Sequence, residues 1–243
     1  AQESRGLGDV YKRQTLKCSK NKMTDVAVSI LTVEQEEATH VFYNLETARP
    51  EYFHIDVMDG KFVENNNLEL MKDYATTISH ISNIPLDVHL MVENVEEIMD
   101  EYMDLLPDRI TFHIEAISDS ERIFNIIDEL KSNGIKIGIA IKPNTKIEEI
   151  KPYLNYIHQV LVMTVEPGKG GQKLIPETLE KIKELRSFVD DNGIDIDIEA
   201  DGGINKETAE DVRNAGTDVL VSGAFIINSE NQREAVEIIR GTK

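Results

Sequence analysis

The sequence predicts an α/β fold, a (β/α)8 or TIM barrel. Eight short apolar runs alternate with eight segments of helical spacing between residues 26 and 239. Continuous apolar strands between amphipathic helices are typical of a parallel sheet that helices cover. Polar side chains near the carboxyl ends of several runs match the end of a barrel where functional groups gather. An open doubly wound sheet is the alternative, but it does not normally place functional residues at so many strand ends.

The first three repeats each combine an apolar run with a helical segment. Their order is strand 26–30, helix 33–45, strand 52–57, helix 68–81, strand 86–91 and helix 95–105. An asparagine-rich loop at 65–67 follows the second strand, and Pro85 opens the third strand, where a missing N–H is tolerated. The last helix of this group is acidic and amphipathic, so we expect it to keep one solvated face.

The remaining elements continue the same alternation. They are strand 109–113, helix 120–132, strand 135–141, helix 147–154, strand 160–165, helix 177–190, strand 194–200, helix 206–215, strand 219–222 and helix 232–239. Ile123, Ile126, Ile127 and Leu130 recur at helical spacing, and Gly134 is placed to end that helix. No composition shift or linker divides residues 23–243, so we expect a single barrel domain.

The first 22 residues differ from the rest and are predicted to be a tail outside the core. They hold six basic and two acidic residues, whereas the remaining chain holds 20 basic and 43 acidic residues. They lack helical or strand periodicity and the apolar core of a secretory signal. Residues 9–14 resemble a translated transposon-end adapter used in sequencing libraries, so we interpret the segment up to about Gln14 as an assembly artefact. A flexible native tail is the alternative.

Composition excludes several classes of function. The net charge of −19 over 243 residues argues against a nucleic-acid partner. No apolar run approaches the roughly 20 residues of a membrane span. The one cysteine, Cys18, permits no disulfide within the chain and indicates a reducing compartment, so we expect a cytoplasmic protein. An anionic substrate would need local neutralisation by a metal ion or by backbone N–H groups.

Metal-ligand residues end three of the predicted strands. His54 and Asp56 are two residues apart, so both side chains point to the same face of their strand. Asp87 and His89 repeat this spacing, and Asp201 ends a third strand. Imidazole and carboxylate groups that share one space are typical of a divalent metal site. Asp87 shares a face with His89, so we expect it either to orient that ring or to join a core network.

Glycines cluster after the last three predicted strands. The clusters are Gly168, Gly170 and Gly171, then Gly202 and Gly203, and finally Gly223. Glycine lets backbone N–H groups approach a ligand closely, and clustered amides bind phosphate without a cationic side chain. In barrels the usual phosphate site follows strands seven and eight. An acidic protein could therefore hold a sugar phosphate; the alternative is that these glycines serve turns only.

Several motifs together resemble the ribulose-phosphate 3-epimerase family. They are SIL (29–31), HIDVMDGKFV (54–63), LDVHLMVEN (86–94), TFHIEA (111–116), VMTVEPGKGGQ (162–172) and EADGGI (199–204). The resemblance implies a barrel of the ribulose-phosphate-binding type that interconverts ribulose 5-phosphate and xylulose 5-phosphate in the pentose phosphate pathway. It also implies one bound divalent metal ion, which could be Zn, Fe, Mn or Co, and a homo-oligomer, since members are often dimers or hexamers.

The resemblance assigns roles to individual residues. The implied metal ligands are His54, Asp56, His89 and Asp201, of which Asp56 and Asp201 are also the two acid/base carboxylates. The implied substrate-binding residues are Ser29, Met58, His89, Met91, Met163, Gly168, Lys169, Gly170, Gly171, Gly202, Gly203, Gly223 and Ala224. Epimerisation beside a carbonyl needs one base on each side of the carbon. Carboxylates from the second and seventh strands meet that requirement, and a metal ion acidifies the substrate.

Three positions depart from the family pattern. Lys169 stands where Phe is common, Glu64 with Asn66 and Asn67 replaces the usual Pro-Asn, and Ala224 stands where Ser is typical. None of these positions is an implied metal ligand, so they bear on the substrate more than on the reaction. The alternatives are an epimerase of a six-carbon ketose phosphate, such as D-allulose 6-phosphate, and a non-catalytic sugar-phosphate-binding barrel. The pair of carboxylates argues against the second, because binding alone needs no two-sided base.

Overall fold

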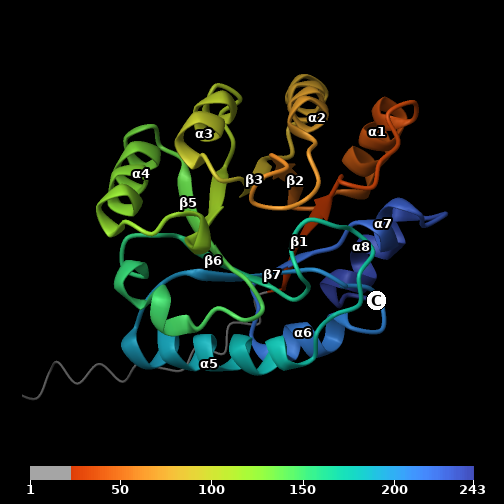
Figure 1. Ribbon diagram of the computed structural model, residues 1–243. Coiled ribbons are helices and arrows are strands. Elements are labelled where there is room, and N and C mark those ends of the chain that lie inside the picture. Colours follow the sequence, from red (N-terminus) through yellow and green to blue (C-terminus); the bar gives the residue numbers. More distant parts are fainter. Residues whose placement is uncertain (1–22) are drawn as a thin grey trace, which may run out of the picture.

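The computed structural model describes residues 23–243, and in this part of the chain eight parallel strands close into a barrel (Figure 1). The strands are β1 (Asp25–Ser29), β2 (Tyr52–Met58), β3 (Leu86–Met91), β4 (Arg109–His113), β5 (Lys136–Ile141), β6 (Gln159–Met163), β7 (Asp197–Asp201) and β8 (Val219–Val221). Each strand pairs with its neighbours in the sequence, and β8 pairs with β1. The (β/α)8 prediction is confirmed. The predicted tail, residues 1–22, lies outside the described residues.

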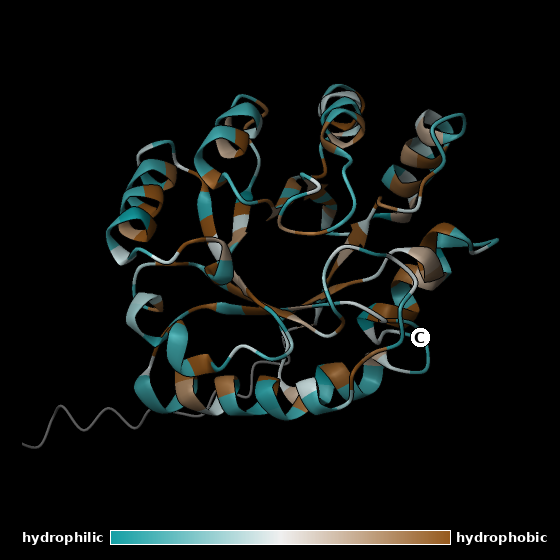
Figure 2. Ribbon diagram, viewed as in Figure 1, coloured by the Kyte–Doolittle hydropathy of each residue, from teal (hydrophilic) through white to brown (hydrophobic). Residues whose placement is uncertain are grey.

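Helices surround the strands on the outside of the barrel (Figure 1). They are α1 (Ala38–Ala48), α2 (Leu68–Ile81), α3 (Val95–Met103), α4 (Ser120–Ser132), α5 (Glu177–Asn192), α6 (Ala209–Ala215), α7 (Ala224–Ile227) and α8 (Gln232–Arg240). The strands are mostly hydrophobic, whereas the helices mix hydrophobic and hydrophilic residues (Figure 2). Among residues 23–243, no helix has both the length and the apolar character that crossing a membrane requires.

Alternation along the strands separates an apolar layer from a polar interior. On β2, Phe53, Ile55 and Val57 belong to the main hydrophobic core, and full burial of each such side chain stabilises the fold by about 1.5–3 kcal/mol. His54 and Asp56 point the other way and are also buried. The strand is therefore buried on both faces, and its polar face is directed into the barrel.

Two predicted helices differ from the structure, and two short elements were not predicted. The helix expected at 147–154 is instead two 3-10 turns, Ile147–Glu149 and Lys151–Tyr153, because Pro152 has no N–H to continue an α-helix. The first helix begins at Ala38 rather than at 33, since Val33 is buried from a turn. The sequence also did not indicate the 3-10 turn Ile114–Ala116 or the short helix α7.

Candidate active site

The predicted metal ligands converge inside the barrel near the carboxyl ends of their strands. His54 and Asp56 lie on β2, His89 lies on β3 and Asp201 ends β7. The parallel register places Asp56 beside His89 on the neighbouring strand. One ligand-type atom from each of the four residues lies within 4.8 Å of all the others. The sequence predicted this grouping correctly.

The spacing of these atoms fits a divalent cation. His89 Nδ1 lies 3.2 Å and His54 Nε2 lies 3.4 Å from Asp56 Oδ1. Asp201 Oδ2 lies 3.7 Å from His89 Nδ1 and 4.0 Å from His54 Nε2. Ligands that bind one ion at about 2.0–2.2 Å lie roughly 3–4 Å apart. His54 Nε2 is buried without a hydrogen-bond partner among the described residues, so it is available as a ligand.

Asp87 orients His54 rather than His89. Its Oδ2 lies 2.8 Å from His54 Nδ1, so this ring nitrogen donates to the carboxylate and Nε2 is the nitrogen directed toward the ligand cluster. The expectation that Asp87 orients His89 was therefore wrong, and the alternative of a buried network is correct. A carboxylate behind a ligating imidazole fixes the ring orientation and its tautomer.

A second group of ligand-type residues, Asp87 and Glu199 with the shared His54, is completely buried. Burial, and then the adjacent Asp87 charge, raise the pKa of Glu199 well above its usual range, which favours its protonated form beside Asp87. The buried Arg109 guanidinium donates to Gln159, which in turn donates to Glu199. This network joins β4, β6 and β7 in the buried interior of the barrel.

The two carboxylates of the ligand cluster, Asp56 and Asp201, have different environments. Burial, and then the Asp56 charge, raise the pKa of Asp201 to about 6. Burial acts in the same direction on Asp56, but His54 and His89 outweigh it and hold the pKa of Asp56 well below its usual range. Ser29 Oγ also donates to Asp56 Oδ2 at 2.7 Å. Two carboxylates with such different surroundings are suited to opposite roles in proton transfer.

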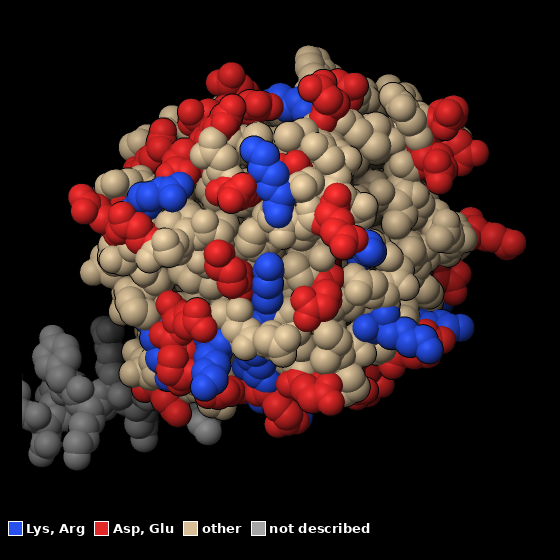
Figure 3. Space-filling view, viewed as in Figure 1, with Lys and Arg blue, Asp and Glu red and all other residues tan. Residues whose placement is uncertain are grey.

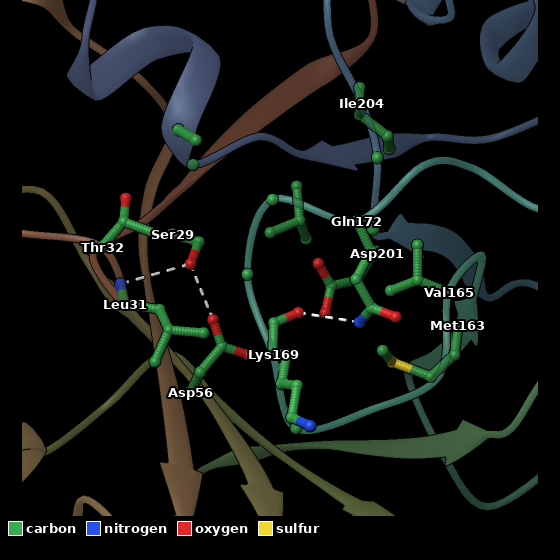
Figure 4. A pocket seen from close by; sticks show the side chains of 18 of the residues that line it. Ser29, Leu31, Thr32, Asp56, Met163, Val165, Lys169, Gln172, Asp201 and Ile204 are labelled. Atoms are coloured by element: carbon green, nitrogen blue, oxygen red, sulfur yellow. Dashed lines mark hydrogen bonds between the residues drawn. The ribbon is translucent and has the colours of Figure 1, made fainter. Parts of the chain in front are cut away.

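A cavity of about 410 Å³ opens above the ligand cluster (Figure 4). The cavity lining contains most of the predicted substrate-binding residues: Ser29, Met58, Met91, Met163, Gly168, Lys169, Gly170, Gly171, Gly202, Gly203, Gly223 and Ala224. Asp56 and Asp201 also line it and lie on different sides in Figure 4. His89 is fully buried and is not part of the lining.

Sequence reasoning missed several polar residues in the cavity lining, including Thr32, Gln172, Asn205 and Glu207. Gln172 had a signal, because it directly follows the glycine cluster of the β6–α5 loop. Its side-chain amide donates to the backbone oxygen of Glu166 at 2.7 Å and to that of Lys169 at 2.8 Å, the second of which Figure 4 shows. These hydrogen bonds hold the loop in place. Thr32, Asn205 and Glu207 lie in loops that follow strands, and no sequence motif distinguished them from other loop residues.

The glycine loops pack too closely for larger residues. Gly203 has φ +68°, and a Cβ there would lie 2.3 Å from the backbone nitrogen of Leu174. Gly202 has φ +121°, and its Cβ would overlap the Val165 side chain. These positions need glycine for both conformation and space, so the β7–α6 loop can lie directly against the β6–α5 loop.

Two departures from the family pattern contact each other. Lys169 Nζ lies 3.4 Å from Glu64 Oε2, and these side chains are 63% and 87% exposed. Beside them, the Asn65 side chain donates to the backbone oxygen of Gly168 at 2.6 Å. The loop after β2 is therefore joined to the loop after β6 at the mouth of the cavity. On the face in Figure 3, acidic groups surround a few central basic groups.

Comparison with known proteins identifies the family of this chain. Residues 25–227 match the sequence model of the Ribulose-phosphate 3 epimerase family. The chain belongs to the ribulose-phosphate 3-epimerase family. It is 39% identical over 218 residues to the ribulose-phosphate 3-epimerase of Methanocaldococcus jannaschii, covering 90% of each chain. It is 36% identical to the Bacillus subtilis enzyme of the same name, covering 91% of this chain and all of the relative.

Membership of the ribulose-phosphate 3-epimerase family makes this chain an epimerase of a pentose phosphate. Solved structures give a similar fold. The 3-keto-L-gulonate-6-phosphate decarboxylase of Vibrio cholerae superposes with a TM-score of 0.67 at 13% identity, covering 90% of this chain and 96% of that one. At so low an identity the likeness concerns the barrel alone.

Proposed function

We propose that this epimerase interconverts D-ribulose 5-phosphate and D-xylulose 5-phosphate by two-base proton transfer at C3, with one divalent metal ion as cofactor. The observation that carries the proposal is the placement of Asp56 and Asp201. They come from strands separated by β1 and β8, face one cavity and share a cluster with two histidines. Binding alone would not require carboxylates on two sides of a substrate.

The chain's own residues divide the proton transfer between two faces. One carboxylate removes the C3 proton, and the other, in its protonated form, returns a proton to the opposite face of the same carbon. The reverse reaction exchanges the two roles, so Asp56 and Asp201 must each be able to hold a proton at a carboxylate oxygen. Ser29 donates to Asp56 Oδ2 and keeps that carboxylate turned toward the cavity.

Positive charge beside the reacting carbon stabilises negative charge that develops on the substrate oxygens, and a divalent cation supplies it when bound. His54, Asp56, His89 and Asp201 would hold the ion. Two imidazoles and two carboxylates suit Zn, Fe, Mn or Co. Because a free aspartate has a pKa near 3.9 and is a weak base for a carbon acid, this stabilisation is needed for turnover.

The remaining lining residues form an apolar part of the cavity and a part that faces the substrate phosphate. Met58, Met91 and Met163 are almost fully buried and form a polarisable wall that limits water. We infer that the glycine loops after β6, β7 and β8 bind the phosphate through backbone amides, which suits a chain of net charge −19.

Deuterium exchange at C3 of ribulose 5-phosphate tests the reaction. The wild-type protein should incorporate solvent deuterium at C3, and Asp56→Asn or Asp201→Asn should lower turnover by roughly 10²–10⁴-fold or more. Glu166→Gln is a matched control, because Glu166 lines the same cavity outside the ligand cluster, and its turnover should change little. Near wild-type turnover in either aspartate variant would refute the assignment. Faster exchange on allulose 6-phosphate would identify a six-carbon substrate instead.

A further inference from the structure

His113 and Glu115 lie behind His89, and neither the substrate nor the ligand cluster explains this pair. His113 ends β4 and is completely buried, outside the cavity lining. Its ring stacks on His89, with centroids 5.1 Å apart and planes 29° apart, and its centroid lies 4.9 Å from that of the Phe62 ring. Glu115 follows two residues later, in the 3-10 turn Ile114–Ala116.

Two successive hydrogen bonds link His89 to His113 and His113 to Glu115. His89 Nε2 lies 3.0 Å from His113 Nε2, and His113 Nδ1 lies 3.0 Å from Glu115 Oε2. The other oxygen of Glu115 accepts from the backbone N–H of Lys142 at 2.7 Å and from the hydroxyl of Thr145. Glu115 is therefore anchored to the β5 end of the barrel at one oxygen and to His113 at the other.

The direction of each hydrogen bond follows from the chemistry of the end groups. His113 and Lys142 hydrogen bonds outweigh burial and lower the pKa of Glu115 to about 2, so the carboxylate is ionised and only accepts. His113 Nδ1 must then carry the hydrogen. An imidazole that carries its hydrogen on Nδ1 has an acceptor at Nε2, and His113 Nε2 lies 3.0 Å from His89 Nε2. His89 consequently donates from Nε2, which leaves a lone pair on Nδ1.

We propose that His113 and Glu115 are positioning residues that hold His89 in the tautomer whose Nδ1 is a metal ligand. His89 Nδ1 is the atom that lies 3.2 Å from Asp56 Oδ1 and 3.7 Å from Asp201 Oδ2. Asp87 performs the same task for His54 by a direct contact. Both imidazoles are therefore oriented from behind by an acidic residue, directly in one case and through His113 in the other. This inference rests on the proposed metal site.

Glu115→Gln is the most informative variant. It keeps the side-chain volume but replaces a carboxylate oxygen that accepts a hydrogen bond from His113 with an amide NH2 group that donates one. The Lys142 N–H and the Thr145 hydroxyl hold the amide oxygen, so the amide NH2 turns toward His113 Nδ1. His113 then carries its hydrogen on Nε2 and opposes the N–H of His89. Loss of such an outer partner weakens metal binding by roughly 10- to 100-fold, so we expect that decrease in affinity for Co²⁺ and Zn²⁺.

Two variants at His113 and one control complete the set. His113→Phe keeps an aromatic ring but removes the acceptor, so the affinity should fall as in Glu115→Gln. His113→Gln can place an amide oxygen near the lost Nε2 and should recover part of the loss. Thr145→Val removes one donor to Glu115 without altering the tautomer of His113, and its affinity should stay within about two-fold of the wild type, well short of the loss expected for an outer ligand partner.

Two readouts that do not depend on activity decide the inference. Chelator competition with Co²⁺ or Zn²⁺ gives the dissociation constants, and circular dichroism of the metal-free proteins confirms folding. Histidine ¹⁵N–¹H correlation spectra of the Zn²⁺-loaded wild type should show His89 protonated at Nε2 and His113 at Nδ1. Unchanged affinity in folded Glu115→Gln, or the opposite tautomers, would overturn this inference alone. A wild type that binds neither ion would overturn the metal site as well.

Discussion

The charge of Lys169 gives a quantitative prediction, because this residue departs from the family pattern and lines the cavity mouth. Its partner is Glu64, 3.4 Å away, and both side chains are mostly exposed. An exposed pair of this kind contributes about 0–1 kcal/mol, so Lys169 Nζ is free to leave Glu64 for an arriving phosphate. We expect Lys169→Ala to raise KM and leave kcat nearly unchanged, the pattern of lost uniform binding.

The magnitude follows from screened electrostatics. Two unit charges 4 Å apart in water attract by about 1 kcal/mol, and physiological salt screens charges over about 8 Å. A dianionic phosphate a few ångströms from Lys169 would therefore gain about 0.5–1 kcal/mol, equivalent to a KM increase of roughly two- to five-fold. Glu64→Gln should act in the opposite direction and lower KM by up to about two-fold, because it removes both a negative charge and the competing partner of Lys169.

Initial-rate kinetics at about 20 mM and about 200 mM salt measure this effect, which should shrink as salt rises. Lys183→Ala is the matched control. It removes the same charge from an exposed ion pair with Glu180 on α5, which does not line the cavity. Its KM should equal that of the wild type. If KM for Lys169→Ala is unchanged at low salt, Lys169 faces solvent and the glycine amides alone bind the phosphate.

Three further predictions concern the metal, the loops and pH. Chelation should abolish activity, and Mn²⁺, Co²⁺, Zn²⁺ or Fe²⁺ should restore it; full activity in a metal-free preparation would refute the ligand assignment. Gly203→Ala should raise KM strongly, because its Cβ would overlap the Leu174 backbone. Gly171 has nearly the same φ, but a Cβ there would have no atom within 4 Å, so Gly171→Ala should cost only the left-handed strain of about 1–2 kcal/mol in unfolding free energy. Equal effects of the two substitutions would contradict the packing argument. Burial lowers the pKa of His158, whose Nδ1 accepts from the backbone N–H of Ile137. The unfolded chain therefore binds this proton at a higher pH than the folded chain, so urea midpoints should fall as pH drops below about 6.5. In His158→Asn the fall should be smaller, and an equal fall would exclude His158 as its source.

Much of the site could be predicted because its signals are local. His54 and Asp56 are two residues apart on an apolar strand, and this spacing alone places both side chains on one face. The alternation of strand and helix indicated the barrel, and the glycine clusters indicated the loops that line the cavity. Where the local signal was misinterpreted, the cause was also local, as at Pro152, which prevents the helix expected at 147–154.

Contacts between strands could not be obtained in this way. The register of β2 against β3 pairs His54 with Asp87 and Asp56 with His89. Asp87 therefore supports His54 on the adjacent strand and not His89, which lies two residues along its own strand. The register of β3 against β4 pairs His89 with Thr111 and brings His113 within hydrogen-bond distance of His89.

The sequence by itself therefore determined the order of the elements, the polar face of each strand and the identity of the ligand-type residues, because each depends on neighbours within a few positions. Tertiary structure alone decided which histidine each acidic residue supports, and that Glu64 meets Lys169 across 105 positions of the chain. The physical reason is that closing a barrel imposes one stagger on all its strands together. That stagger depends on the packing of the whole sheet and its helices, which no short stretch of sequence contains.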